Sequence, residues 1–169
     1  MKKPNVLCIV GAKRHVGKTA VLTKIIGEMK RRGLSVGTIK HIGDRSAFDL
    51  PERKDTSKHL DAGSSITLAV TSSEIISIRR DLPITLESAI SQMPSQLDFI
   101  LVEGFRRSSF PKLIIVNSHD EDVQGVSGDT IALIVDGKEI IRSGNGSQTR
   151  QFSQAYLVDL IEEYFQASH

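Results

Sequence analysis

The residue types with the clearest chemistry in this chain form a short loop close to its N-terminus, Ala12 to Thr19. The loop follows an apolar run from Val6 to Val10 and precedes apolar residues at helical spacing. A strand, a tight loop and a helix start are the setting in which a P-loop binds phosphate, because backbone N–H groups and the positive end of the helix dipole face the anion. In such a loop Lys18 contacts the β- and γ-phosphates, and the Thr19 hydroxyl holds Mg²⁺.

The sequence of the loop departs from the usual G-x-x-x-x-G-K-T. Counting back from Gly17, Ala12 takes the place of the first glycine, and Gly11 lies one residue earlier, where it gives the strand exit its flexibility. Lys13 resembles the early lysine of the variant loop K-G-G-V-G-K-T in the MinD and ParA ATPases, which contacts nucleotide, often across a dimer interface. We expect the nucleotide to lie against the whole loop and the first helical residues: Ala12, Lys13, Arg14, His15, Val16, Gly17, Lys18, Thr19 and Ala20.

Strands and helices are expected to alternate along the chain. Apolar runs predict strands over residues 6–10, 34–39, 65–70, 75–79, 98–104, 113–116 and 131–135. Helical spacing predicts helices from within the loop to residue 32, and over residues 55–61, 85–93 and 152–165. This order indicates the α/β class: a single P-loop nucleotide-binding domain over residues 1–169, with a mostly parallel, doubly wound sheet and helices on both faces. The binding site of such a sheet lies at the carboxyl ends of its strands.

Two strand ends carry candidate residues of that site. Glu103 closes an apolar strand, where a carboxylate can hold Mg²⁺ or polarise the attacking water, as the Walker B acid does. The alternative is an acid that only satisfies a nearby helix N-terminus. Lys40 ends the second strand together with His41, in a position that faces the γ-phosphate in P-loop folds. Both side chains could instead be simply solvated.

Two aspartates have open assignments. Asp55 begins a short predicted helix, so it is either a helix cap or a group near Mg²⁺ and the γ-phosphate. Asp136 follows a late apolar strand, where a carboxylate can accept from guanine N1–H and N2–H₂ together. It is also the first residue of Asp136-Gly137, a common turn pair.

Composition narrows the class of partner and the compartment. A net charge of +2 over 169 residues, with the basic residues scattered, does not indicate a nucleic-acid-binding face. The single cysteine, Cys8, lies within the first apolar run, reads as a small core residue and suits a reducing compartment. The five apolar residues that follow the basic N-terminus are too few for a signal peptide or a membrane span. A cytoplasmic protein without a membrane partner is expected.

The ordered set of motifs resembles the molybdopterin-guanine dinucleotide biosynthesis adaptor family, MobB. The motifs are the P-loop, Gly37–His41, Lys54–His59, Ala62-Gly63, Leu101–Phe105, Pro111-Lys112 and, more weakly, Ile131–Asp136. The resemblance implies a GTP-binding P-loop protein, often a homodimer, that assists the molybdenum cofactor guanylyltransferase and hydrolyses GTP slowly with Mg²⁺. It implies phosphate and Mg²⁺ roles for Lys18 and Thr19, a metal-site role for Glu103, and a place near the γ-phosphate for Asp55.

Two other functions remain open on sequence grounds. The loop also resembles that of dethiobiotin synthetase, which favours an ATP-dependent ligase or kinase-like enzyme. Lys13 favours a nucleotide switch of the MinD and ParA kind. The loop differs from the usual S-G-K-T-T of the MobB family at Val16 and Ala20, and Ile42 follows Lys40-His41 where the family often has further histidines. A preference for ATP over GTP would favour the ligase or kinase-like enzyme over the adaptor. Dimerisation that depends on nucleotide would favour the switch.

Overall fold

The structure, a computed structural model, describes residues 3–13, 15–43, 55–80, 83, 85–118, 125–142 and 148–168. Most of the polar segment of residues 41–54, between the strand predicted over 34–39 and the helix predicted over 55–61, lies outside these ranges, as does most of the polar segment 144–148. The chain divides into two compact units, one made of residues 1–41 with 90–169, and the other of residues 42–89. The P-loop belongs to the first unit.

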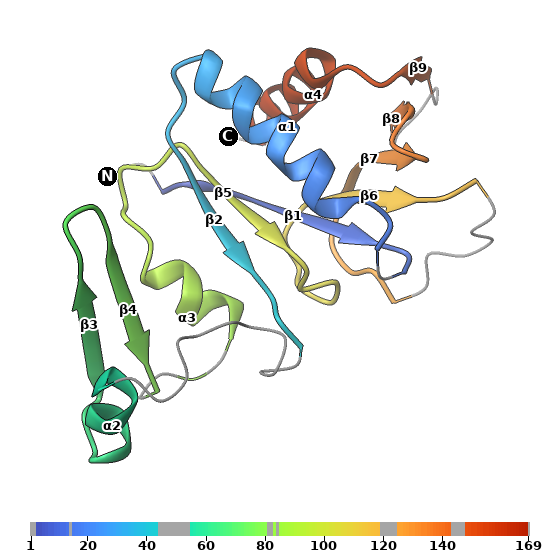
Figure 1. The fold of residues 1–169 in the computed structure, drawn as a ribbon. Helices are drawn as coiled ribbons and strands as arrows, with labels where there is room; N and C mark the ends of the chain where they lie inside the picture. Colours follow the sequence, from blue (N-terminus) through green and yellow to red (C-terminus); the bar gives the residue numbers. More distant parts are fainter. Residues whose placement is uncertain are drawn as a thin grey trace. The chain divides into compact units, whose positions relative to one another are not determined.

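A seven-stranded sheet forms the centre of the first unit, in the order β2-β5-β1-β6-β7-β8-β9 (Figure 1). Its strands in chain order are β1 (Asn5–Gly11), β2 (Val36–Lys40), β5 (Phe99–Glu103), β6 (Lys112–Val116), β7 (Thr130–Val135), β8 (Glu139–Arg142) and β9 (Thr149–Gln151). The first five in spatial order run parallel, and β8 and β9 are antiparallel to their neighbours. The α/β class and the mostly parallel sheet are therefore confirmed.

The antiparallel edge formed by β8 and β9 was not foreseen. The chain reverses after β7 through Asp136 and Gly137, whose φ angles are 51° and 65°. Two consecutive positive φ angles match the right-handed twist of hairpin strands, and Asp-Gly is a preferred pair for them. The turn signal was present in the sequence. The strands that it serves are short, and only part of β8 is buried, so their periodicity is weak.

One face of the sheet is covered by two helices, α1 (Lys18–Arg31) and α4 (Gln154–Ala167), which pack on each other (Figure 1). Alternate residues of a strand face opposite sides, so Leu7 and Ile9 of β1 share this core with Ile25 of α1 and Ile161 of α4. Full burial of each such side chain contributes roughly 1.5–3 kcal/mol. Strands β1 and β5 are buried on both faces, so their sequences are continuous apolar runs. Those runs predicted both core strands correctly.

The opposite face of the sheet carries a buried lysine. Lys112 on β6 is the register partner of Cys8 and is fully buried. Its Nζ donates to the Ser108 carbonyl at 2.7 Å, the Phe110 carbonyl at 2.6 Å and the Ser108 hydroxyl at 3.1 Å. Burial lowers the pKa of Lys112 and raises the pKa of Cys8. These bonds fasten the segment between β5 and β6 to the sheet, and Cys8 is confirmed as a core residue.

The second unit contains α2 (Asp55–Asp61) and a two-stranded antiparallel sheet, β3 (Ile66–Val70) with β4 (Ile75–Arg79). Helix α3 (Leu86–Ser91) crosses the boundary between the units. The large exposed apolar side chains of the described part of the chain all belong to the hairpin formed by β3 and β4: Ile66, Leu68, Val70, Ile75 and Ile76. Across the described ranges, no helix combines the length and the apolar character that crossing a bilayer requires.

A cluster of charges joins the end of α1 to α4. Glu28 is 6% exposed and accepts hydrogen bonds from Arg31 at 2.6 and 2.8 Å and from Arg32 at 2.8 Å. Arg32 also donates to Asp159 at 2.7 Å and to Glu162 at 2.6 Å, both on α4. The bonds from Arg31, followed by those from Arg32, lower the pKa of Glu28 to about 2. The C-terminal helix is thereby fixed to the helix that begins at the P-loop.

We predict that this cluster makes folding stability depend on acid pH. Because the pKa of Glu28 is about 2 in the folded chain and 4.5 in its ordinary state, its stabilising effect is complete above pH 4.5. The effect declines as pH falls from 4.5 to 2. Urea unfolding between pH 2 and pH 7 should therefore show a shallower acid loss in Glu28→Gln than in the wild type. Glu139→Gln, at an exposed carboxylate of β8, is the control; equal acid loss in both variants would contradict the assignment.

Candidate nucleotide-binding site

The loop between β1 and α1 has the close packing that a phosphate cradle needs. The Ala12 N–H donates to the Ile115 carbonyl at 3.0 Å, which fixes the loop entry to β6. A Cβ placed on Gly11 would collide with Cγ2 of Val16 and would lie 3.2 Å from Nζ of Lys18. Gly11 rather than Ala12 is therefore the glycine that this loop requires at the strand exit. His15 has a φ of 60°, an uncommon left-handed conformation that concentrates at functional loops.

The helix N-terminus faces this loop without competing anionic groups of its own. Helix α1, described in full, begins at Lys18 with Gly17 as its N-cap, and Gly17 has a φ of 87°. Gly17 makes no side-chain hydrogen bond to the helix N-terminus, and no acid lies in the first turn of α1. The first N–H groups and the positive helix end are thus available to an anion. The Lys18 ammonium donates to the Lys13 carbonyl at 3.2 Å, so the side chain turns back over the loop.

The predicted metal-site pair, Thr19 and Glu103, is brought together. The Thr19 hydroxyl donates to both oxygens of the Glu103 carboxylate, at 3.0 and 3.2 Å, across 84 positions of sequence. A hydroxyl oxygen beside a carboxylate is a donor set that suits Mg²⁺, which completes its shell with waters and substrate phosphates. The described residues contain no ready-made group of three His, Cys, Asp or Glu side chains. Thr19 and Glu103 therefore fit the protein side of a Mg²⁺ site, and Mg²⁺ binding itself stays a prediction.

Lys40 lies beside the same carboxylate. Lys40 and Glu103 are register partners in the parallel strands β2 and β5, and Nζ of Lys40 is 3.7 Å from Oε2 of Glu103. The following residue, His41, donates its N–H to the Glu103 carbonyl at 2.9 Å. Its ring lies 4.7 Å from the ring of Phe105. The structure therefore places Lys40 at the same strand edge as Thr19 and Glu103, as the sequence indicated.

The other predicted site residues have different positions. Asp55 belongs to the second unit, where its exposed carboxylate is 3.0 Å from Nζ of Lys58, and its place near the γ-phosphate stays a prediction. Asp136 lies at the carboxyl end of β7 and accepts from the Ser118 N–H at 3.0 Å. That contact and its turn conformation agree with the turn assignment, and guanine recognition stays a prediction. Arg14 lies outside the described residues.

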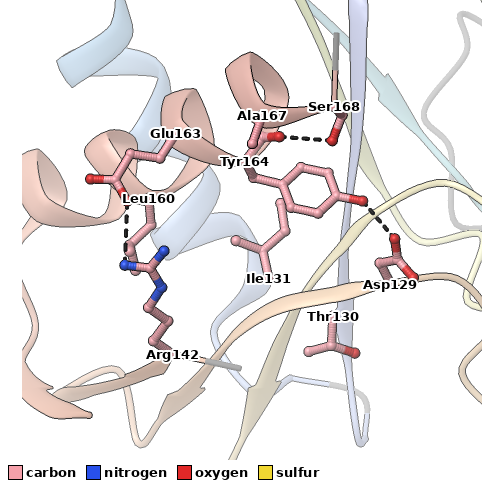
Figure 2. A pocket seen from close by; sticks show the side chains of 9 residues that line it. All are labelled: Asp129, Thr130, Ile131, Arg142, Leu160, Glu163, Tyr164, Ala167 and Ser168. Atoms are coloured by element: carbon pink, nitrogen blue, oxygen red, sulfur yellow. Dashed lines mark hydrogen bonds and ion pairs between the residues drawn. The ribbon is translucent and has the colours of Figure 1, made fainter. Parts of the chain in front are cut away.

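A separate cavity of about 630 Å³ lies between the start of β7 and the C-terminal half of α4 (Figure 2). Its polar groups are paired: the Tyr164 hydroxyl donates to Asp129 at 2.7 Å, and Arg142 lies 3.3 Å from Glu163. Burial, assisted by the Asp129 carboxylate, raises the pKa of Tyr164 to about 12. Because β7 runs parallel to β1, the cavity lies at the amino ends of the parallel strands, whereas the P-loop lies at their carboxyl ends. It is lined by Asp129, Thr130, Ile131, Arg142, Leu160, Glu163, Tyr164, Ala167 and Ser168, none of which is a predicted site residue.

A mostly parallel sheet with this loop after β1, and with an acid at the end of the adjacent strand β5, defines a P-loop NTPase. Residues 6–136 match the family model described as molybdopterin guanine dinucleotide synthesis protein B, MobB, so the chain belongs to the MobB family. The match contains the whole site described above. It confirms the family resemblance read from the motifs and associates the chain with molybdopterin guanine dinucleotide synthesis.

Named relatives agree with the family. A probable molybdopterin-guanine dinucleotide biosynthesis adapter protein of Bacillus subtilis is 28% identical over 152 residues, covering 88% of this chain and 86% of that protein. The corresponding adapter protein of Haemophilus influenzae is 35% identical over 101 residues, 59% of this chain and 56% of its own length. A crystal structure of molybdopterin-guanine biosynthesis protein B superposes with a TM-score of 0.70 at 21% identity, covering 95% of this chain and 99% of the other. That likeness confirms the fold.

Gly104 provides a test of how the site is held, because it joins Glu103 to Phe105. Its φ is 110°, and an added Cβ would lie 2.8 Å from Cβ of His41. We predict that Gly104→Ala lowers the free energy of unfolding by about 1–3 kcal/mol through this strain. Gly27→Ala, on the exposed side of α1 with nothing within 4 Å, should raise it by up to about 1 kcal/mol. Denaturant unfolding of both variants checks the opposite signs; a gain in stability at Gly104 would refute the assignment.

Proposed function

We propose that this chain is a GTP-binding adapter of molybdopterin guanine dinucleotide biosynthesis that hydrolyses GTP slowly with Mg²⁺. The observation that carries the proposal is the contact of the Thr19 hydroxyl with the Glu103 carboxylate beside the loop. The adapter role is taken from the names of its relatives in Bacillus subtilis and Haemophilus influenzae. The protein partner that suits this role is the molybdenum cofactor guanylyltransferase.

The site residues divide the work of hydrolysis. The loop amides and the start of α1 orient the phosphates, and Lys18 neutralises charge that develops between the β- and γ-phosphates. Glu103 is 8% exposed, so its carboxylate can hold a water in a fixed direction. Thr19 and Glu103 would be the protein ligands of Mg²⁺, which would supply further charge neutralisation. Asp136 is the group proposed to accept from guanine, and Asp55 the group proposed to approach the γ-phosphate.

Lys18→Ala tests nucleotide binding directly. We predict a fall in GTP affinity of about 100-fold or more, because hydrogen bonds to charged groups contribute roughly 1.5–3 kcal/mol each. Titration calorimetry with Mg²⁺ gives the measurement, and Lys30→Ala, at an exposed position of the same helix, is the matched control. Unchanged affinity in Lys18→Ala would overturn the proposal. A wild type that prefers ATP over GTP would instead favour the ligase or kinase-like enzyme.

We also propose that two copies of the chain associate through the β3–β4 hairpin. The register places Leu68, Val70 and Ile75 on one face of this sheet, at 57%, 71% and 70% exposure. Among the described strands, β3 and β4 pair only with each other, so both edges of the sheet are open. An isolated two-stranded sheet is marginally stable, and an open apolar edge readily pairs with another chain. A second copy offers the same apolar face and edge, which suits a two-fold interface.

The dimer is tested by charging the apolar face. We predict that Leu68→Asp combined with Val70→Asp weakens self-association by about tenfold or more. The reason is that each aliphatic side chain buried by the interface would contribute roughly 1.5–3 kcal/mol. Sedimentation at several protein concentrations, with and without GTP, measures the change. Ser72→Asp, at the exposed turn of the same hairpin, should leave the mass unchanged. A wild type that stays monomeric at high micromolar concentration would exclude this interface.

A further inference from the structure

Lys40 and Glu103 form a loose pair at the mouth of the site. Their strands put them side by side, yet the distance between Nζ and Oε2, 3.7 Å, is too long for a hydrogen bond. The Lys40 side chain is 57% exposed and the Glu103 side chain 11%. The carboxylate is therefore inside the site and the ammonium at its rim. An ion pair that lacks a hydrogen bond and has one partner at the solvent rim is held weakly, so Lys40 can exchange Glu103 for a stronger anion at little cost.

The same carboxylate already serves the position expected for Mg²⁺. It accepts from the Thr19 hydroxyl at 3.0 and 3.2 Å on the side of α1, and it is approached by Lys40 from the side of β2. A divalent cation between Thr19 and Glu103 would bring two positive charges close to the Lys40 ammonium. Because the cation and the Lys40 ammonium repel each other, both can lie beside Glu103 only if Lys40 moves away or receives an anion of its own.

A γ-phosphate is such an anion, and a diphosphate lacks it. We propose that Lys40 makes the site prefer a nucleoside triphosphate with Mg²⁺ over the diphosphate, by exchanging Glu103 for the γ-phosphate. With the diphosphate, Lys40 has no new partner and competes with Mg²⁺ for Glu103. Lys40 is thus a specificity-determining residue of the nucleotide site, and this inference rests on the proposed nucleotide binding.

The test compares GTP and GDP, each with Mg²⁺ and each with a chelator. In the wild type with Mg²⁺, GTP should bind at least about tenfold more tightly than GDP. Lys40→Met should weaken GTP by about tenfold or more and leave GDP unchanged or slightly tighter, so the preference collapses. Lys40→Arg, which keeps the charge, should retain the preference. Lys30→Met is the control for loss of a surface charge, and urea unfolding of each variant verifies that it folds.

Each other result has a definite meaning. If Lys40→Met weakens GTP and GDP equally, Lys40 only positions Glu103 and the inference is wrong. If neither affinity changes, Lys40 is outside the site and the inference is also wrong. A wild type that binds neither nucleotide would overturn the proposed function together with the inference. A wild type that prefers adenine would overturn only the GTP proposal, and the same comparison with ATP and ADP would then decide the role of Lys40.

Discussion

The parallel pairing of β1 with β5 is the constraint on which the site depends. It places Glu103 opposite Ile9, two residues before β1 ends and the P-loop begins. The 84-residue separation between Thr19 and Glu103 is closed by this register and by the start of α1. A slip of one residue would turn the Glu103 side chain to the other face of the sheet and so away from Thr19. The apolar core thus fixes the chemistry at its edge.

The contact between Thr19 and Glu103 is supported by three neighbouring elements of the fold. Helix α1 carries Thr19, and the charges around Arg32 bind its far end to α4. Strand β2 contributes Lys40 on the outer side of β5. The three bonds from Lys112 hold the segment after Glu103 on the opposite face. Each of these contacts is a hydrogen bond or an ion pair, whereas the core that α1 and α4 share with the sheet is apolar.

Much of this arrangement could be predicted from residue types and spacing. Helix α2 was predicted with its observed bounds, and the strands containing Leu7 and Leu101 were found because their apolar runs are continuous. The strand ends at Lys40 and Glu103 could be assigned to one edge because parallel strands align their carboxyl ends. The expectation of one domain over residues 1–169 and the assigned roles of the site residues stay predictions. Strands β8 and β9 were missed because short, half-exposed strands carry little periodicity.

The contacts of long polar side chains were the least predictable part. The motif Pro111-Lys112 did not reveal that Lys112 is fully buried, whereas Lys30 lies on the surface. Its burial depends on three acceptors that the segment between β5 and β6 presents only when folded. Arg32 likewise lies at a helix end, where solvation would be expected, yet it contacts two acids more than 120 residues away. Such contacts follow from tertiary packing, which spacing along the chain does not encode.

Cys8 gives the protein a built-in chemical reporter. It is the only cysteine in the chain, is fully buried in β1, and lies 3.4 Å from the Ser108 hydroxyl. A thiol reagent reaches it only when the segment over that face of the sheet detaches or the whole unit unfolds. Burial also raises its pKa, which keeps the reactive thiolate scarce in the native state. The rate of alkylation of this single atom therefore measures how often the sheet behind the phosphate loop opens, in the natural chain and without an attached probe.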